Sequence, residues 1–271
     1  MSSIRRVALP LAATSLALLA GCASNGTAGE TAPVASAEPV NPAFVPASAE
    51  ERIRAERMPP LERANFWARE YNKTPNDLET ALHFGEALRA IGSEQRAVEV
   101  MTEIEVDYPG AGEPKLLRGR ALSALNKVQE ARRAFMAAAT LMPGNADALA
   151  ALGLANDRLG DHISAQTAYR QALELAPSRP STLSNLGLSL TLTGDIEEAE
   201  QVLREATVLD PENTHIRQNL ALVLGLQGRY DEMIEAAGDA PEAVVRRNAD
   251  LLRRLRGDTA ATPTPTENGA G

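Results

Sequence analysis

Cysteine, histidine and aromatic residues are scarce in this chain of 271 residues. The single cysteine, Cys22, excludes an intramolecular disulfide, and none of the three histidines lies in a metal-binding pattern such as H-E-x-x-H. Four Phe, four Tyr and one Trp are too few for a typical β-sandwich or barrel, because strands draw on aromatic and β-branched side chains. We therefore expect no metal site, no cofactor and no all-β fold.

The chain also contains relatively few positive charges and few long apolar runs. Lys and Arg number 27 against 36 Asp and Glu, a net charge of −9. An acidic chain without a basic stripe is a poor nucleic-acid binder and is not held at an anionic membrane by charge. No Ser lies in a nucleophile-elbow pattern and no Gly-rich phosphate loop occurs. We predict that the protein is not an enzyme and takes no small-molecule substrate.

The N-terminus has the features of an export signal. Two arginines in Met1–Arg6 precede the apolar run Val7–Leu19, which is shorter than the roughly 20 residues of a membrane-spanning helix. The following Leu19–Cys22 (LAGC) resembles a bacterial lipobox, in which cleavage before the cysteine leaves an acylated N-terminal residue. This predicts a signal peptide over residues 1–21 and lipidation at Cys22. Ordinary cleavage after Ala23 and a buried structural cysteine are the alternatives.

The resemblance to bacterial lipoproteins implies a firm, three-chain anchor. Ala rather than Asp at position 23 then implies the outer membrane, with the protein facing the periplasm. Residues 22–58 are rich in Ala, Ser and Pro and have too little apolar surface to offset the entropy of ordering. We expect a disordered tether there and a disordered tail over residues 257–271.

Ala and Leu, which favour helix, dominate the rest of the chain, and small residues recur there at a fixed spacing of 34 residues. The pattern resembles the tetratricopeptide repeat (TPR), a pair of antiparallel helices. It predicts an all-α fold, a right-handed superhelical TPR solenoid of about five repeats plus capping helices, with the array over residues 78–247. The positions that carry the spacing are Gly85, Gly119, Gly153 and Gly187; Ala97, Ala131, Ala165 and Ala199; and Pro109, Pro143, Pro177 and Pro211. The units start at Leu78, Gly112, Ala146, Pro180 and Thr214.

Helices outside the repeats are expected to cap the array. Residues 59–77 predict a helix whose Trp67 packs against the first full unit. Residues 241–256 predict a C-terminal capping helix, and its arginines form either a solvated face or a phosphate or glycan site. Its inward residues are expected to be Val244, Val245, Leu251, Leu252 and Leu255.

In TPR proteins the first helix of each unit lines a concave groove. The resemblance implies a groove that is charged in the first units and apolar, with amides, in the last ones. It suits an extended or helical peptide of a protein partner, unless the chain's own C-terminal helix or tether covers it. The candidate groove residues are Leu154, Asp157, Arg158, Asn185, Leu188, Leu192, Gln218, Asn219, Leu222 and Leu226.

Two C-terminal stretches narrow the resemblance. Residues 217–228 (RQNLALVLGLQG) and 248–252 (NADLL) resemble the end of the TadD family, lipoproteins of the tight-adherence (Flp) pilus system. This resemblance implies a non-catalytic role in pilus biogenesis, as a pilotin-like factor for assembly of the outer-membrane secretin. The alternative is a TPR lipoprotein adaptor that organises peptidoglycan enzymes or another envelope complex.

Overall fold

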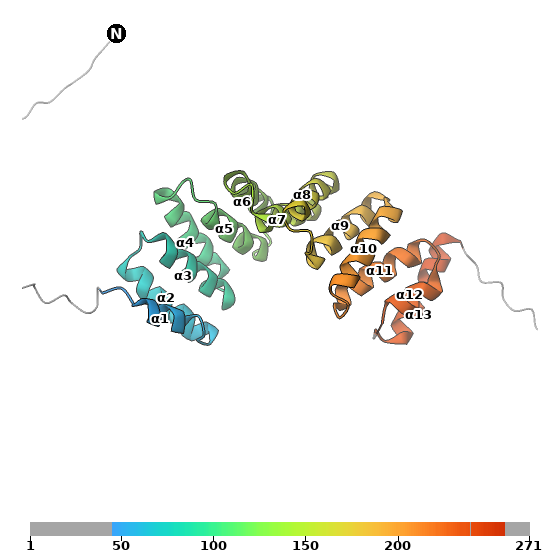
Figure 1. Cartoon of the computed structure of the whole chain (residues 1–271), viewed down its shortest axis with the longest axis horizontal. Helices are drawn as coiled ribbons and strands as arrows, with labels where there is room; N and C mark the ends of the chain where they lie inside the picture. The colour runs from blue at the N-terminus through green and yellow to red at the C-terminus, as the bar shows by residue number, and fades with distance from the viewer. Residues whose placement is uncertain (1–44, 239, 258–271) are drawn as a thin grey trace, which may run out of the picture. The chain divides into compact units, whose positions relative to one another are not determined.

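The structure, a computed structural model, describes residues 45–238 and 240–257. These residues form helices joined by short turns, with no strand among them, and consecutive helices pack against each other along the chain (Figure 1). The helices are α1 (Ala49–Ala55), α2 (Pro60–Lys73), α3 (Leu78–Ala90), α4 (Glu94–Asp107), α5 (Glu113–Ala124), α6 (Val128–Leu141), α7 (Ala146–Arg158), α8 (His162–Leu175), α9 (Pro180–Thr193), α10 (Ile196–Leu209), α11 (Thr214–Leu226), α12 (Tyr230–Ala236) and α13 (Glu242–Arg256).

The helices from α3 to α12 form five pairs. Each first helix packs on the second helix of its own pair and on the helix before it, which is α2 for α3 and the second helix of the preceding pair for the others. Helix α9 also contacts its counterparts α7 and α11. The first helices α3, α5, α7, α9 and α11 begin at the start of each 34-residue unit or one residue later. The all-α TPR solenoid predicted from the spacing is therefore the fold of the described residues.

Helix ends follow from local sequence. The side chain of Asp77 accepts a hydrogen bond from the Thr80 amide, and Asn145 does the same for Ala148. Such caps satisfy backbone donors that the first turn of a helix leaves unpaired. At the turn inside the third pair, Gly160 has φ of +79°, a left-handed conformation that favours glycine. In the second pair, Asn126 occupies the equivalent turn position, with φ of +60°.

Small residues set the spacing between paired helices. Ala97, Ala131, Ala165 and Ala199 are completely buried, one on each of the second helices α4, α6, α8 and α10. Gly153 of α7 lies against the Tyr169 ring of α8 so closely that a Cβ atom there would be 2.6 Å from Tyr169 Cε1. The periodic Gly and Ala therefore mark the places where the two backbones of a unit approach each other.

The expectation of a disordered tether over residues 22–58 is wrong for its last part. Residues 45–58 are ordered, and α1 begins with a capping box in which Ser48 and Glu51 each bond the other's backbone amide. The Ala47 amide donates to Glu70 of α2 at 2.7 Å, and Ala55 is fully buried. Composition alone misled the prediction, because a local cap, one buried alanine and hydrogen bonds to α2 hold this short helix.

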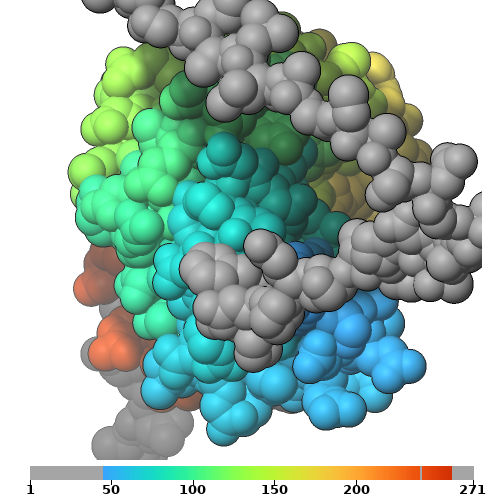
Figure 2. Space-filling model, turned by 90° about the vertical axis from the view of Figure 1, so that its left-hand side faces the viewer, coloured from blue at the N-terminus to red at the C-terminus, as the bar shows by residue number. Residues whose placement is uncertain are grey.

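Helices α1 and α2 cover the N-terminal end of the array, where their surface is continuous with that of α3 (Figure 2). Trp67 of α2 stacks on His83 of α3 with ring centroids 4.3 Å apart, so it packs on the first full unit. Its indole Nε1 donates to Glu56, just after α1, at 3.0 Å. One side chain thus joins the three helices.

The capping helix α13 lies on α11 and α12, but its inward face differs from the expectation. Val245 is buried as expected, Leu252 is half-buried against the core, and Ala249 is buried as well. Val244, Leu251 and Leu255 are instead exposed. Successive helical residues are about 100° apart, so a face centred on Val245 and Ala249 turns the other three outward. Hydrophobicity alone did not show which of the two apolar faces of α13 would pack against the array.

Several predictions concern residues beyond these ranges. Cys22, the signal peptide, most of the tether and residues 258–271 lie outside the described residues. Among the described helices, none has both the length and the apolar character needed to cross a membrane.

Candidate partner-binding groove

Three leucines at equivalent positions stay exposed on successive first helices. Leu154, Leu188 and Leu222, which we call the leucine row, are 44%, 37% and 38% exposed on α7, α9 and α11. The preceding glycine at position 153 or 187 turns instead toward the second helix of the same unit. The repeat thus places a small residue inward and the following leucine outward.

Hydrogen bonds between first helices show that the row lies on neighbouring elements. Asn219 Nδ2 of α11 donates to Ser184 Oγ of α9 at 3.0 Å. Ser189 Oγ of α9 donates to Asp157 Oδ1 of α7 at 2.7 Å. Because α7, α9 and α11 are in direct contact, the three leucines share one side of the array.

Other predicted groove residues border this row. Leu192, also on α9, is exposed, and Leu226 at the end of α11 is half-buried. Gln218 is exposed and Asn185 half-buried, so their amides are accessible beside the leucines. This mixture of aliphatic side chains and amides can accept apolar side chains and bond the backbone of a bound peptide.

Three of the predicted groove residues are engaged within the array. Asp157 Oδ1 accepts the hydrogen bond from Ser189 Oγ and also lies 2.9 Å from His162 Nδ1. Arg158 donates to the Asn126 side chain at 2.7 Å and to Ser123 Oγ at 2.8 Å, both in the preceding unit. The third is Asn219, whose amide bonds Ser184. Their spacing suggested a contact role, but their hydrogen bonds join one unit to the next.

The side chain of Tyr169 on α8 is fully buried against Gly153 of α7 and lies within the electrostatic influence of Asp157. Burial raises the pKa of Tyr169 far above its ordinary value, and the negative charge of Asp157 acts in the same direction. The phenol therefore stays neutral over the physiological range. It acts as a packing residue against Gly153 rather than as a titrating group.

The charged part of the groove is a chain of ion pairs that the sequence did not reveal. Arg120 of α5 lies 3.7 Å from Glu86 of α3 and 3.5 Å from Asp147 of α7. Asp147 also pairs with Arg179, which precedes α9. Glu86 and Arg120 lie 34 residues apart, at matching positions of successive units, so a comparison of the first helices would have found this pair. Asp147 and Arg179 occupy other positions of the repeat, so their part of the chain does not follow from such a comparison.

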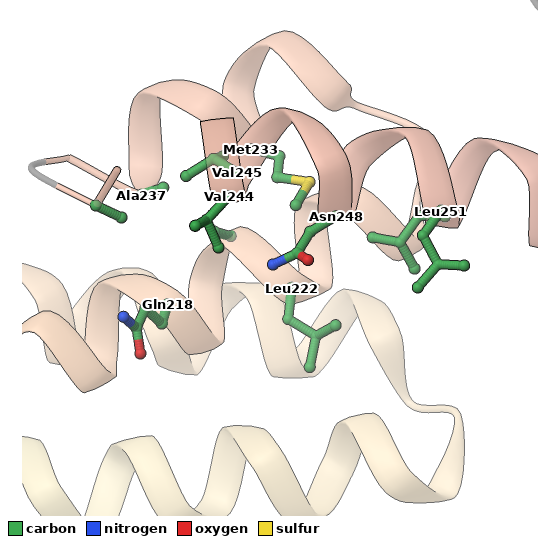
Figure 3. Close-up of a pocket in the computed structure, with 11 residues that line it drawn as sticks. Gln218, Leu222, Met233, Ala237, Val244, Val245, Asn248 and Leu251 are labelled. Carbon is green, nitrogen blue, oxygen red and sulfur yellow. The ribbon is translucent and has the colours of Figure 1, made fainter. Parts of the chain in front are cut away.

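Helix α13 adjoins the end of the leucine row without covering the rest. A pocket of about 410 Å³ lies between α11, α12 and α13. Gln218 and Leu222 on α11 face Val244 and Asn248 on α13 across it (Figure 3). In the described structure Leu154 and Leu188 remain exposed, so self-coverage by α13 is limited to the neighbourhood of Leu222.

The tetratricopeptide-repeat family model matches residues 116–180 and 158–214. Solved structures that resemble the chain include MamA, at 23% identity over 62% of this chain and 98% of that one, with a TM-score of 0.55. A second is MamA 41-end from Desulfovibrio magneticus RS-1, at 21% identity over 66% and 96%, with a TM-score of 0.53. A third is YrrB, described as a TPR protein with an unusual peptide-binding site, at 18% identity over 72% and 99%, with a TM-score of 0.57.

Comparison with curated proteins gives no significant match. At these identities the structural likeness shows the fold alone. Together with the helix pairs and the matched repeats, it is sufficient to establish the architecture. The chain contains tetratricopeptide repeats and folds as a TPR solenoid, the architecture of scaffolds that bind other proteins.

Proposed function

We propose that the protein is a non-catalytic scaffold that binds a protein partner along the leucine row. The observation that carries this proposal is the exposure of Leu154, Leu188 and Leu222 on three adjacent first helices. Large aliphatic side chains grouped on one surface mark an interaction site more often than single exposed ones do. The bordering amides of Asn185 and Gln218 favour an extended or helical segment of the partner.

We further propose that the scaffold is a lipoprotein, anchored through Cys22 in the outer membrane and facing the periplasm. There it acts as a pilotin-like factor for secretin assembly in tight-adherence (Flp) pilus biogenesis. The lipobox-like Leu19–Cys22 and the resemblance of residues 217–228 and 248–252 to TadD proteins support this role. The TPR fold is compatible with it but does not by itself choose the partner.

Deletion of the gene tests the pilus role. We expect secretin multimers on immunoblots and surface pili to be lost, and wild-type protein to restore both. A Leu188→Asp variant of unchanged thermal stability should fail to restore them, because a charge in the row disfavours burial of the partner's apolar side chains. Normal multimers and pili in the deletion strain would contradict the pilus role.

Replacement of the predicted lipidation site tests the anchor. We expect Cys22→Ser to move the protein from the membrane fraction to the soluble periplasmic fraction, since serine cannot form the thioether. The neighbouring Ala23→Ser change leaves the thiol in place and serves as the matched control. Retention of Cys22→Ser in the membrane fraction would show that another feature holds the protein there.

A further inference from the structure

The exposed side of α13 has the spacing of a coiled-coil seam. Val244, Asn248, Leu251 and Leu255 follow one another at intervals of four, three and four residues, which is the spacing of alternating d and a positions in a heptad. Val244, Leu251 and Leu255 are 39%, 48% and 73% exposed, and Asn248 is exposed as well. A two-heptad apolar seam with one polar a position is thus left unpaired on this helix.

The opposite side of α13 fixes the direction in which the seam points. Val245 and Ala249 are buried against the array. The guanidinium of Arg253 lies 4.4 Å from the centroid of the Tyr230 ring, and Arg256 donates to the Leu226 carbonyl of α11. The seam lies beside these contacts, and its residues Val244, Asn248 and Leu251 form, together with the neighbouring Val245, one wall of the pocket whose other wall carries Leu222 (Figure 3).

Two arginines flank the seam on its outer edge. Arg247 and Arg254 occupy successive g positions, immediately before Asn248 and Leu255, and both are exposed. The described part of the chain gives neither of them a carboxylate within 4.0 Å, whereas Arg246 pairs with Glu242 at 2.6 Å and Arg253 with Asp250 at 2.9 Å. In coiled coils, g positions form ion pairs with the partner helix.

We propose that this seam is a second docking site, which takes an amphipathic helix from another protein. The apolar a and d side chains of the partner helix enter the pocket beside Leu222, and the carboxylates of the partner helix pair with Arg247 and Arg254. The concave pocket favours a helix over a flat membrane surface, because side chains can fill it and a planar bilayer cannot. The partner helix is thus acidic along one edge and aliphatic along the next.

Charge and composition disfavour occupants from this protein itself. In an antiparallel pair with a second copy, Arg247 and Arg254 would lie opposite like charges. In a parallel pair they would lie beside Val245 and Leu252 of the other copy, which are already packed on its array. Residues 258–271 contain no Leu, Ile, Val, Met or Phe, and the apolar run at residues 7–19 contains no acid. Residues 22–44 carry Pro33, Pro39 and Pro42, which interrupt a helix, so an amphipathic acidic helix for the seam comes from a different chain.

Two synthetic helical peptides of about 21 residues, three heptads each, provide the test. Both have Leu at d and Ile at a with one Asn, and they differ only in Glu or Lys at e and g. In fluorescence-anisotropy titrations with the full chain, we expect the Glu peptide to bind roughly ten-fold more tightly than the Lys peptide. The double change Arg247→Glu and Arg254→Glu should reverse this preference, and Leu251→Asp should abolish binding of both peptides while thermal unfolding stays unchanged.

Two control variants distinguish binding at the seam from binding elsewhere on the chain. Arg246→Glu alters a charge on the same helix but away from the seam, and should keep the preference for the Glu peptide. Leu154→Asp should keep it as well, so failure of the leucine row and failure of this proposal are distinguishable. Equal binding of both peptides, or a preference that survives the double reversal, would overturn the proposal. Binding to phosphatidylglycerol vesicles that the double reversal removes, without peptide binding, would assign the helix to a membrane surface instead.

Discussion

At the scale of single residues, the periodic glycines matter through the ring or side chain that each one faces. At Gly153 a Cβ would lie 2.6 Å from Tyr169 Cε1, and the buried ring cannot rotate away without disturbing its neighbours. At Gly85 the nearest atoms are the ends of the flexible Leu117 and Met101 side chains. The same small residue is therefore more restrictive in the third unit than in the first.

We predict that Gly153→Ala destabilises the protein by about 1–3 kcal/mol, because a methyl group must displace the Tyr169 ring. The higher helix propensity of alanine, worth about 1 kcal/mol, acts in the opposite direction and is the smaller effect. Urea unfolding followed by circular dichroism measures the difference. Gly144→Ala, with no atom within 4 Å of the added Cβ, is the control. A Gly153→Ala variant as stable as wild type would refute the close approach.

Glu200 of α10 is a carboxylate that joins one unit to the next. It accepts hydrogen bonds from Gln227 at 2.7 Å and from Arg229 at 2.6 Å, and it pairs with Arg204 on its own helix. Burial alone would raise the pKa of Glu200, but the bonds from Gln227 and Arg229 and the nearby positive charges lower it below the ordinary 4.5.

The lowered pKa of Glu200 predicts a pH dependence with a definite sign. The unfolded chain takes up a proton at Glu200 more readily than the folded one, so this stabilisation is present above about pH 4.5 and is lost as the pH falls through the folded-state value. Glu200→Gln should therefore lower the free energy of unfolding by about 1–2 kcal/mol at neutral pH and by much less near pH 3. Thermal unfolding across this range measures it. The more exposed Glu198→Gln should show a smaller effect, and a loss at Glu200→Gln independent of pH would contradict the ionic origin.

At the scale of elements, α1 is held by a few contacts at its two ends. The buried Glu70 accepts from the Ala47 amide and pairs with Lys73, and Glu56 accepts from Trp67. An isolated helix of seven residues is far too short to be stable in water. These contacts, rather than the helix propensity of α1, keep it in place.

We predict that Glu70→Ala releases α1 and speeds tryptic cleavage after Arg52 or Arg54 by roughly ten-fold, because a lost buried hydrogen bond to a charged group is worth about 1.5–3 kcal/mol. Mass spectrometry of a limited digest gives the cleavage rate. Glu62→Ala, an exposed position on the same helix, should leave it unchanged. Equal rates for wild type and Glu70→Ala would mean that other contacts hold α1.

Sequence reasoning predicted the helix pairs because spacing and small residues determine them directly. It missed α1 because the small residues and prolines of residues 22–58, read together, indicate a tether, while the capping box at Ser48 is a local signal. It misplaced the inward face of α13 because both faces carry aliphatic residues and only packing selects Val245 and Ala249. It also assigned Asp157 to partner contacts, because the hydrogen bond to Ser189, 32 residues away, does not follow from the repeat pattern alone.

At the scale of the whole array, each unit contacts mainly its neighbours, so a surface that spans several units depends on their regular stacking. The leucine row spans three units, and the ion pairs from Glu86 to Arg179 extend over the two units before it and into its first unit. Bonds such as Asn219 to Ser184 keep the first helices in register. A partner that binds the row therefore contacts several units at once.

The central claim, that the leucine row is the partner-binding surface, is tested most directly by photo-crosslinking in cells. A photoreactive amino acid replaces Leu188 on α9 in one strain and Val208, 81% exposed on α10 of the same unit, in another. We predict a discrete crosslinked product, which mass spectrometry identifies as a secretin or another envelope protein, from position 188 and none from position 208. The same products from both positions, or the absence of any product from position 188, would contradict this claim.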